Sequence, residues 1–198
     1  MKIILVRHGQ TEENVKGISQ GQIPGSLTEK GIEQAKKTAE YLKDERIDVI
    51  YSSDLARTKD TTQQIAKYHK NIPIVYTKEL REMGKGSFDG KPREVCVEFV
   101  KKSGKPFYEC EWDSGESLIK VQKRIKKFYD KIVNNHKDET ILIVSHGGVI
   151  ASLLLCLKGE GYDKYDYYKP KNSAITVLEV EKEGRQKIKK FDFVEHLK

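Results

Sequence analysis

Two segments of the chain share one design, an apolar run that ends at a histidine followed by glycine. The first reads IILVRHG over residues 3–9, and the second reads ILIVSHG over residues 141–147. Short apolar runs that are rich in β-branched residues and bounded by glycine are typical of buried strands. Open α/β sheets bind their ligands beyond the carboxyl ends of such strands. The two segments therefore predict an α/β sheet with a functional site beside the histidines.

Length and composition predict one globular domain spanning 1–198. The chain has 198 residues, of which 37% are hydrophobic and 34% are charged, enough for one buried core and few for two ordinary domains. No stretch approaches the roughly 18 apolar residues of a membrane helix, so no membrane partner is expected. The first residues lack the apolar core and cleavage site of a secretory signal, which predicts a cytoplasmic protein.

The cysteines and the charge pattern exclude other classes. Cys96, Cys110 and Cys156 lack the spacing of a disulfide framework or a zinc site, so no metal or cofactor is expected. The net charge is +7, but basic and acidic residues are interspersed without an arginine-rich arm, which disfavours a nucleic-acid partner. A positive field also attracts small anionic substrates.

Helix-like and strand-like patterns alternate along the chain, which predicts a three-layer α/β/α sandwich with a mostly parallel central sheet. Helices are expected from the Thr28 N-cap to about 44, then over 54–69, 116–134 and 149–157; further strands are expected over 48–53, 72–76 and 140–145. A last hairpin is expected over 174–180 and 186–191, turning near Glu183-Gly184. Glycines and prolines interrupt 79–115, which predicts an irregular lid or wall over the site.

Four basic side chains follow the predicted strands. Arg7 and His8 follow the first strand, Arg57 lies one turn into the helix after the second, and His146 follows a later one. Arginine matches the oxygens of a phosphate with paired N–H groups. A neutral histidine can accept a phosphoryl group and so divide hydrolysis into two steps without a metal. The predicted ligand is therefore a phosphoryl group.

A general acid must also protonate the leaving oxygen and then activate water. Glu82 is the candidate, because it follows an apolar strand region and begins the glycine-rich stretch.

These motifs resemble the histidine phosphatase superfamily, in its phosphoglycerate mutase-like branch. The resemblance runs from about residue 2 to 180 and is carried by LVRHGQTEEN at 5–14, LTEKG at 27–31, YSSDLART at 51–58, LREMGKGSFDG at 80–90, GES at 115–117 and VSHGG at 144–148. It implies a phosphoglycerate mutase-like fold, with His8 as the phosphorylated nucleophile and Glu82 as the proton donor. It implies that Arg7, Arg57 and His146 line the phosphate pocket.

The resemblance also implies supporting contacts to the phosphate. Asn14 matches a polar residue near the phosphate, Gln20 lies in a loop that usually contacts it, and the Gly147 backbone N–H adds a further contact. The Gly9 carbonyl holds the second nitrogen of His8 and selects the reactive tautomer. Homodimers are common among relatives, so a homodimer is a further expectation.

The resemblance leaves the activity to be chosen. Cofactor-dependent mutases carry a long insertion between the glutamate motif and the Gly-Glu-Ser motif, whereas only 83–114 separates them here. This favours a metal-independent phosphomonoester phosphatase, acting on a small phosphorylated metabolite, over a phosphoglycerate mutase. A non-catalytic phospho-ligand binding module is disfavoured because both nucleophile and acid are present. The substrate stays open, although Lys85, Lys91 and Arg93 suggest a sugar phosphate with two anionic groups or a phosphorylated carboxylic acid.

Overall fold

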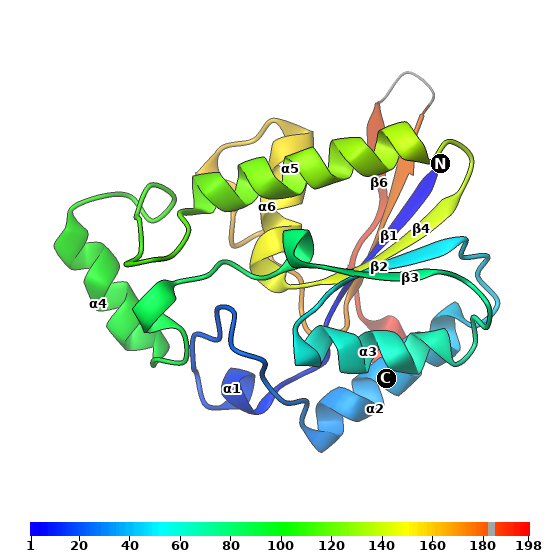
Figure 1. Ribbon diagram of the computed structural model, residues 1–198, viewed down its shortest axis with the longest axis horizontal. Helices are drawn as coiled ribbons and strands as arrows, with labels where there is room; N and C mark the ends of the chain where they lie inside the picture. The colour runs from blue at the N-terminus through cyan, green and yellow to red at the C-terminus, as the bar shows by residue number, and fades with distance from the viewer. Residues whose placement is uncertain (182–184) are drawn as a thin grey trace.

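The structure is a computed structural model that describes residues 1–181 and 185–198. Its centre is a six-stranded sheet in the order β3-β2-β4-β1-β5-β6 (Figure 1). The strands are β1 (Lys2–Arg7), β2 (Val49–Ser53), β3 (Ile74–Thr77), β4 (Thr140–Ser145), β5 (Ile175–Val180) and β6 (Gln186–Phe193). The first four run parallel to one another, and β5 and β6 complete the sheet as antiparallel neighbours.

Helices cover both faces of this sheet. They are α1 (Glu12–Val15), α2 (Glu29–Leu42), α3 (Ala56–Ala66), α4 (Arg93–Ser103), α5 (Leu118–Asn135) and α6 (Gly147–Lys158), with short 3-10 turns η1 (Lys78–Leu80), η2 (Gly86–Phe88), η3 (Tyr162–Lys164) and η4 (Glu195–Leu197). In Figure 1, α5 and α6 lie on one face, and α2 and α3 lie on the other. The predicted three-layer α/β/α sandwich with a mostly parallel sheet is confirmed.

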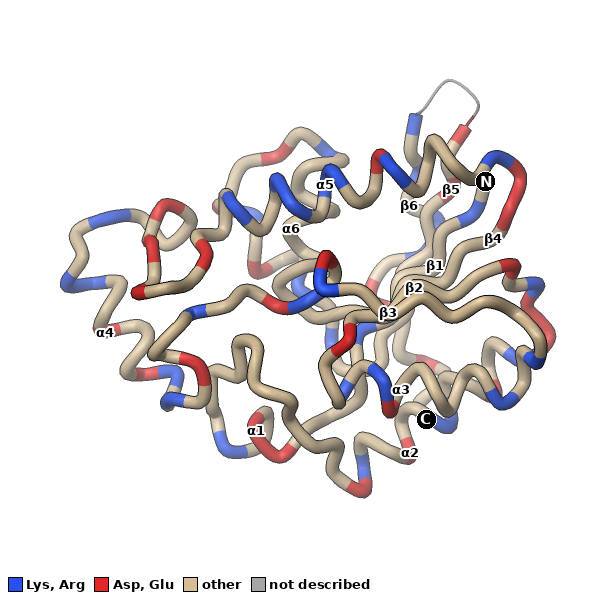
Figure 2. Tube along the Cα trace, viewed as in Figure 1, with Lys and Arg blue, Asp and Glu red and all other residues tan. Residues whose placement is uncertain are grey.

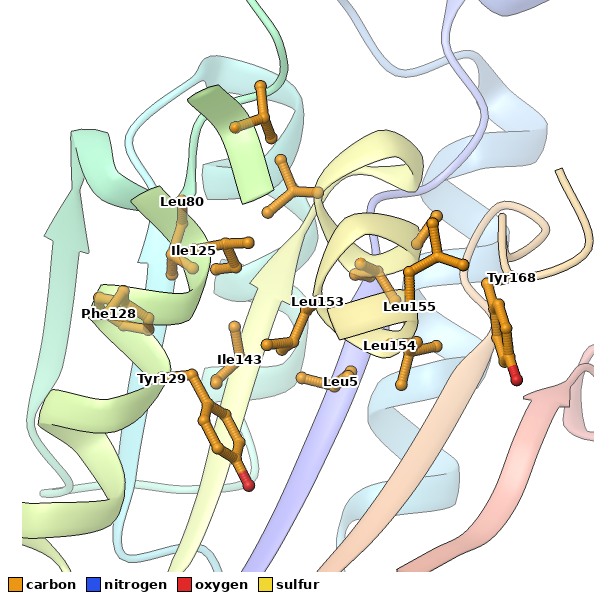
Figure 3. Packing of buried hydrophobic residues seen from close by; sticks show 14 of the residues in the cluster. Leu5, Leu80, Ile125, Phe128, Tyr129, Ile143, Leu153, Leu154, Leu155 and Tyr168 are labelled. Atoms are coloured by element: carbon orange, nitrogen blue, oxygen red, sulfur yellow. The ribbon is translucent and has the colours of Figure 1, made fainter. Parts of the chain in front are cut away.

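The alternation of side chains along each strand builds the two cores. Ile3 and Leu5 of β1 join the core under α5 and α6, whereas Ile4 and Val6 join the core over α2 and α3. Figure 3 shows Leu5 close to residues of α6 in the first of these cores. Because successive strand residues point to opposite faces, a strand buried on both sides reads as a continuous apolar run. Each fully buried side chain of this size contributes about 1.5–3 kcal/mol relative to exposure.

The segment 79–115 is more regular than its sequence suggests. The expectation of irregular structure throughout is wrong for α4, which lies away from the sheet (Figure 1). Pro92 occupies the N-cap of this helix, and Gly104 ends it with a φ of +66°. Proline is tolerated at the start of a helix, where the backbone N–H has no partner within the helix, and glycine is favoured where a helix ends in the left-handed region. The residues read as helix breakers therefore delimit a helix.

Helix starts differ from the predicted ones where tertiary contacts intervene. Thr28 caps α2 as expected, because its hydroxyl accepts the Gly31 N–H at 2.9 Å. Helix α3 begins at Ala56 and not at the predicted Asp54, since the Asp54 carboxylate accepts two hydrogen bonds from Arg81 at 2.6 Å. The turn predicted near Glu183-Gly184 lies outside the described residues.

The loop after β1 is pressed against the start of α2. A Cβ on Gly9 would overlap the carbonyl oxygen of Gly31, and a Cβ on Gly31 would overlap the carbonyl oxygen of Gln10. Neither glycine has room for a side chain without displacing backbone. This contact brings the start of α2 against the chain immediately after His8.

Charged side chains of both signs are spread along the chain (Figure 2). Over 1–181 and 185–198, no helix is long and apolar enough to cross a membrane. In the same residues, no group of three or more histidines, cysteines and acids is arranged to hold a metal ion.

Candidate active site

His8 follows the last residue of β1 and is held in one orientation. Its backbone N–H donates to the Ser145 carbonyl at 3.1 Å, which links it to the end of β4. Its Nδ1 lies 2.8 Å from the Gly9 carbonyl. A carbonyl oxygen only accepts, so Nδ1 carries the proton and Nε2 keeps its lone pair. Burial, with Arg57 and Arg7 nearby, holds the pKa of His8 well below 6.5, so the imidazole is neutral and nucleophilic at pH 7.

Asn172, which the sequence analysis did not select, fixes the loop around His8. Its Nδ2 donates to the carbonyls of His8 and Gly9 at 3.1 and 3.2 Å and to Asn14 Oδ1 at 3.1 Å. Asn14 Oδ1 also accepts the Thr11 N–H, closing a reciprocal cap at the start of α1. The side chain of Asn172 comes from the turn before β5, 164 residues beyond His8. No local pattern in the sequence reveals so distant a contact.

Arg57 is a buried cation that has no carboxylate partner among residues 1–181 and 185–198. Its guanidinium donates to the carbonyls of Gly21, Ile23 and Pro24 at 2.9, 2.5 and 3.1 Å. Within the described residues Arg57 forms no surface ion pair with Asp54 or Asp60 on its own helix, because Arg57 is 1% exposed and Asp54 pairs with Arg81. Burial lowers the pKa of Arg57 to about 10, so it stays charged at neutral pH. Its positive charge is therefore available to a ligand.

Arg7 presents a second guanidinium beside His8. Its Nη1 donates to the Pro170 carbonyl at 2.7 Å, and burial lowers its pKa. The Nε atoms of Arg7 and Arg57 are buried and have no hydrogen-bond partner among the described residues. Buried N–H groups without partners are costly and uncommon in folded proteins. An oxyanion in the cavity would accept from both.

His146 lies next to His8, with the two ring centroids 5.2 Å apart. It is fully buried at the N-cap of α6. Its Nε2 lies 2.8 Å from the Ser53 hydroxyl, and its Nδ1 has no partner in the described part of the chain. Burial, together with Arg57 and His8, holds the pKa of His146 well below 6.5. His146 is therefore a neutral side chain with one nitrogen left for a ligand.

Glu82 reaches the cavity from the loop after η1. Its Oε1 accepts the Met83 N–H at 2.9 Å, and its Oε2 accepts the Gly148 N–H at 3.1 Å. The second contact places the carboxyl group at the N-terminus of α6. The carboxyl group is thus oriented by two backbone donors.

An ion pair behind this loop holds both of its ends. Arg124 of α5 donates to the carbonyls of Glu79 and Arg81 at 2.7 and 2.9 Å and forms two hydrogen bonds with the Glu116 carboxylate. Glu116 in turn accepts the Gly84 N–H at 3.2 Å. These contacts bracket Glu82 from both sides along the chain, and they account for the glutamate of the Gly-Glu-Ser motif.

These side chains surround a cavity of about 150 Å³ at the carboxyl ends of β1 and β4. The cavity is lined by Arg7, His8, Asn14, Ile18, Ser19, Gln20, Gly21, Arg57, Glu82, Met83, Lys85, Arg93, Phe107, Gly148, Tyr165 and Lys169. Six of the predicted site residues belong to this wall. His146 and Gly147 are not among the lining residues, whereas Gly148 is.

A second and larger cavity of about 560 Å³ adjoins the first. The two share Lys85, Arg93, Phe107, Tyr165 and Lys169 as lining residues. Tyr165 and Lys169 come from the loop after α6 and were not selected from the sequence. Their contribution depends on how that loop folds back, which no residue spacing encodes.

Comparison with known proteins agrees with this geometry. Residues 3–192 match the family model of the histidine phosphatase superfamily, branch 1. The chain belongs to this superfamily. It is accordingly a phosphoric monoester hydrolase of the histidine phosphatase type.

Three proteins named as phosphoserine phosphatases are similar to this histidine phosphatase over most of its length. Phosphoserine phosphatase 1 of Hydrogenobacter thermophilus is 33% identical over 100% of this chain and 94% of its own. The metal-independent phosphoserine phosphatase of Arabidopsis thaliana is 36% identical over 78% of this chain and 67% of its own. A crystal structure of a mutant Entamoeba histolytica phosphoserine phosphatase in complex with phosphoserine has a TM-score of 0.86 and 30% identity, covering 99% of this chain and 98% of that one.

Proposed function

We propose that this histidine phosphatase hydrolyses small phosphorylated metabolites through a phosphohistidine at His8, without a metal ion. The observation that carries the proposal is a neutral His8, with Nε2 unprotonated, beside three buried nitrogens without partners on Arg7, Arg57 and His146. A phosphoryl group bound at His8 would give each of them an acceptor, and its charge would be balanced by the two guanidiniums.

In the first step, the lone pair of His8 Nε2 attacks phosphorus and the bond from phosphorus to the leaving oxygen breaks. Glu82 gives its proton to that oxygen, so a neutral alcohol leaves. In the second step, Glu82 takes a proton from water as the water oxygen attacks phosphorus. The P–N bond breaks, inorganic phosphate is released, and His8 recovers its lone pair. Arg7 and Arg57 hold the equatorial oxygens in both steps.

We test this mechanism by replacing the nucleophile. His8→Ala is expected to lower kcat by at least about 10⁴-fold, since the covalent route is lost, while His196→Ala serves as a control outside the cavity. Brief reaction with ³²P-labelled substrate and a denaturing alkaline quench should label the wild type on His8. Activity should persist in EDTA. Near-wild-type turnover by the His8 variant, or loss of activity on chelation, would refute the mechanism.

The cavity wall also favours a substrate with a second anionic group. Lys85, Arg93 and Lys169 all line it, and no ion pair with a carboxylate is formed by any of them within the described residues. The Lys85 ammonium donates to the Ser19 hydroxyl at 2.7 Å, and burial lowers its pKa. Cations left without carboxylate partners at a cavity attract an anion. Phosphoserine and 3-phosphoglycerate, named in the related structures, carry such a carboxylate.

Two substrates of matched size test this assignment. Glycerol 3-phosphate differs from 3-phosphoglycerate by a hydroxymethyl group in place of the carboxylate. We expect the wild type to prefer the carboxylate by kcat/KM, and the triple variant Lys85→Met, Arg93→Met, Lys169→Met to lose most of that preference. An unchanged preference would exclude these cations as the recognition site. A parallel assay for 2-phosphoglycerate distinguishes mutase activity from hydrolysis.

The proposal also includes the role of segment 79–115 and the compartment of the enzyme. The segment 79–115 supplies Glu82, Lys85 and Phe107 to the cavity wall, and we assign it as the lid over the leaving group. We assign the enzyme to the cytoplasm, in keeping with cysteines that are free thiols.

A homodimer is the third part of the proposal. The edge strand β3 exposes Ile74, Val75 and Tyr76 to 36%, 41% and 39%, an apolar edge of the kind that pairs with another chain. Sedimentation equilibrium of the wild type and a Val75→Lys variant tests this assembly. A monomeric wild type would refute it.

A further inference from the structure

Ser53 ends β2 and has its hydroxyl directed at His146. The residue is fully buried. Its Oγ lies 2.8 Å from His146 Nε2 and 3.4 Å from the Leu55 backbone nitrogen. These are the two hydrogen-bond contacts of the hydroxyl among the described residues. The Leu55 N–H can only donate, so it uses a lone pair of Oγ.

Counting protons at this contact assigns the tautomer of His146. The Ser53 hydroxyl has one proton, and His146 Nε2 is the acceptor within its reach. If Nε2 carried the imidazole proton instead, the hydroxyl proton would be buried without an acceptor and the lone pair of Nδ1 would be buried without a donor. Unsatisfied buried polar groups cost about 1–3 kcal/mol each. The chain Leu55 N–H to Ser53 O–H to His146 Nε2 satisfies these three groups and leaves one buried group, the Nδ1–H of the neutral ring, without a partner in the described residues. The opposite tautomer leaves two.

We propose that Ser53 is a positioning residue that holds His146 in the tautomer protonated on Nδ1. In that state the buried Nδ1–H, which has no partner in the described residues, donates a hydrogen bond to a phosphoryl oxygen at His8. The proposal rests on phosphoryl transfer at His8. In the opposite tautomer, Nδ1 would direct a lone pair at the phosphoryl oxygen, and the two would repel.

Both histidines then carry their proton on Nδ1, but they present different ring nitrogens to the phosphoryl group. His8 keeps its proton on Nδ1 through the Gly9 carbonyl and offers Nε2 as a nucleophile. His146 accepts at Nε2 from Ser53 and offers Nδ1–H as a donor. Because a neutral donor suffices, His146 acts without being protonated, in accord with a pKa that burial holds well below 6.5. The hydrogen bond from His146 Nδ1–H therefore does not require acidic pH.

The direct test is ¹⁵N NMR of the imidazole rings in the wild-type enzyme, which needs no substitution at Ser53. His146→Asn assigns the His146 signals by their loss. We expect a protonated, pyrrole-type Nδ1 and an unprotonated, pyridine-type Nε2 at neutral pH. The reverse pattern would overturn the proposal, whatever the enzyme's activity.

Kinetics of Ser53→Ala test the consequence for the reaction. Without the hydroxyl, we expect a protonated Nε2 to appear in the NMR spectrum and kcat to fall about 10–100-fold with a small change in KM, because a donor to the transition state is lost. Ser53→Thr keeps the hydroxyl and should restore the wild-type NMR pattern of His146 and the wild-type kcat. Ser52→Ala is the matched control, since Ser52 is an equally buried neighbour whose hydroxyl donates to a backbone carbonyl and not to His146.

The outcomes separate this proposal from the proposed function. A Ser53→Ala enzyme with the wild-type tautomer and kcat would refute the role of Ser53 while leaving the phosphohistidine mechanism intact. Absence of ³²P on His8 in the wild type would refute the mechanism, while the NMR result would still decide the tautomer.

Discussion

The two buried arginines of this site donate to backbone carbonyls and form no ion pair within the described residues, while the nearby Glu82 offsets part of the effect of burial on both pKa values. Arg57 is held by three carbonyl oxygens, and Arg7 by one. A carboxylate partner would stabilise the same burial but would compete with the phosphoryl group for the cation. Carbonyl dipoles orient the guanidinium without cancelling its charge, so the electrostatic contribution is directed to the ligand.

The geometry of Arg57 predicts that lysine cannot replace it. A lysine ammonium is a point charge and cannot donate to three carbonyls while also reaching a phosphate. We expect Arg57→Lys to lower kcat/KM by about 10²–10³-fold, the typical effect of removing a transition-state donor. The exposed Arg46→Lys is the control. Steady-state kinetics on one substrate measures both, and equal kcat/KM for the Arg57 variant and wild type would contradict the assignment.

At the scale of secondary structure, local patterns predicted what short-range physics decides. The continuous apolar run of β1, which is buried on both faces, and the apolar stripe of α5 were readable because each depends on the pattern of one element. The start of α3 was wrong because Arg81, distant in sequence, takes the Asp54 carboxylate. Helix α4 was missed because Pro92 and Gly104 were read as breaks within a loop.

The same difference between local patterns and long-range contacts applies to the site residues. Residues at the end of a strand or directly after it, such as Arg7, His8 and His146, could be selected because topology brings strand ends together. Asn172 and Tyr165 could not, since they enter from the segment between α6 and β5 through long-range contacts. The catalytic roles of the selected residues stay predictions, to be decided by the variants described above.

The loop that carries Glu82 depends on α5 for its position. Replacing Arg124 by Met removes the hydrogen bonds to Glu79, Arg81 and Glu116, so the carboxyl group of Glu82 loses its fixed orientation. We expect kcat to fall about 10-fold or more with little change in KM, because imprecise placement penalises the transition state most. Lys123→Met, on an exposed position of the same helix, is the control for activity.

The double variant Arg124→Met, Glu116→Gln separates positioning from stability. It removes the carboxylate that the single variant leaves unpaired, so the melting temperature should recover in part. If kcat recovered with it, the loss in the single variant would reflect instability and not the placement of Glu82.

For the molecule as a whole, several histidines are folded in their neutral form. Burial lowers the pKa of His196 to about 4 and holds those of His8 and His146 well below 6.5. In the unfolded chain these histidines have ordinary pKa values near 6.5. At a pH below 6.5 but above the folded-state pKa values, the unfolded chain therefore binds more protons than the folded chain. Acidification therefore favours unfolding, and the free energy of unfolding should decrease as pH falls below about 6.5.

Thermal unfolding between pH 7.5 and pH 4.5 tests this dependence. We expect the wild-type melting temperature to fall on acidification and His196→Gln to show a smaller fall, because it has one fewer proton to take up on unfolding. His196 is only half-buried, so its share should be modest. A melting temperature that rises on acidification would contradict the direction of these pKa shifts.

The contact between Gly9 and Gly31 has a consequence for how this sequence can diverge. Each glycine is blocked by backbone atoms that belong to or adjoin the other one's segment, so no single substitution at either position relieves the other. The two positions are therefore constrained together, although Gly9 lies beside His8 and Gly31 lies on a helix. Substitution at either position would therefore have to move the backbone next to His8.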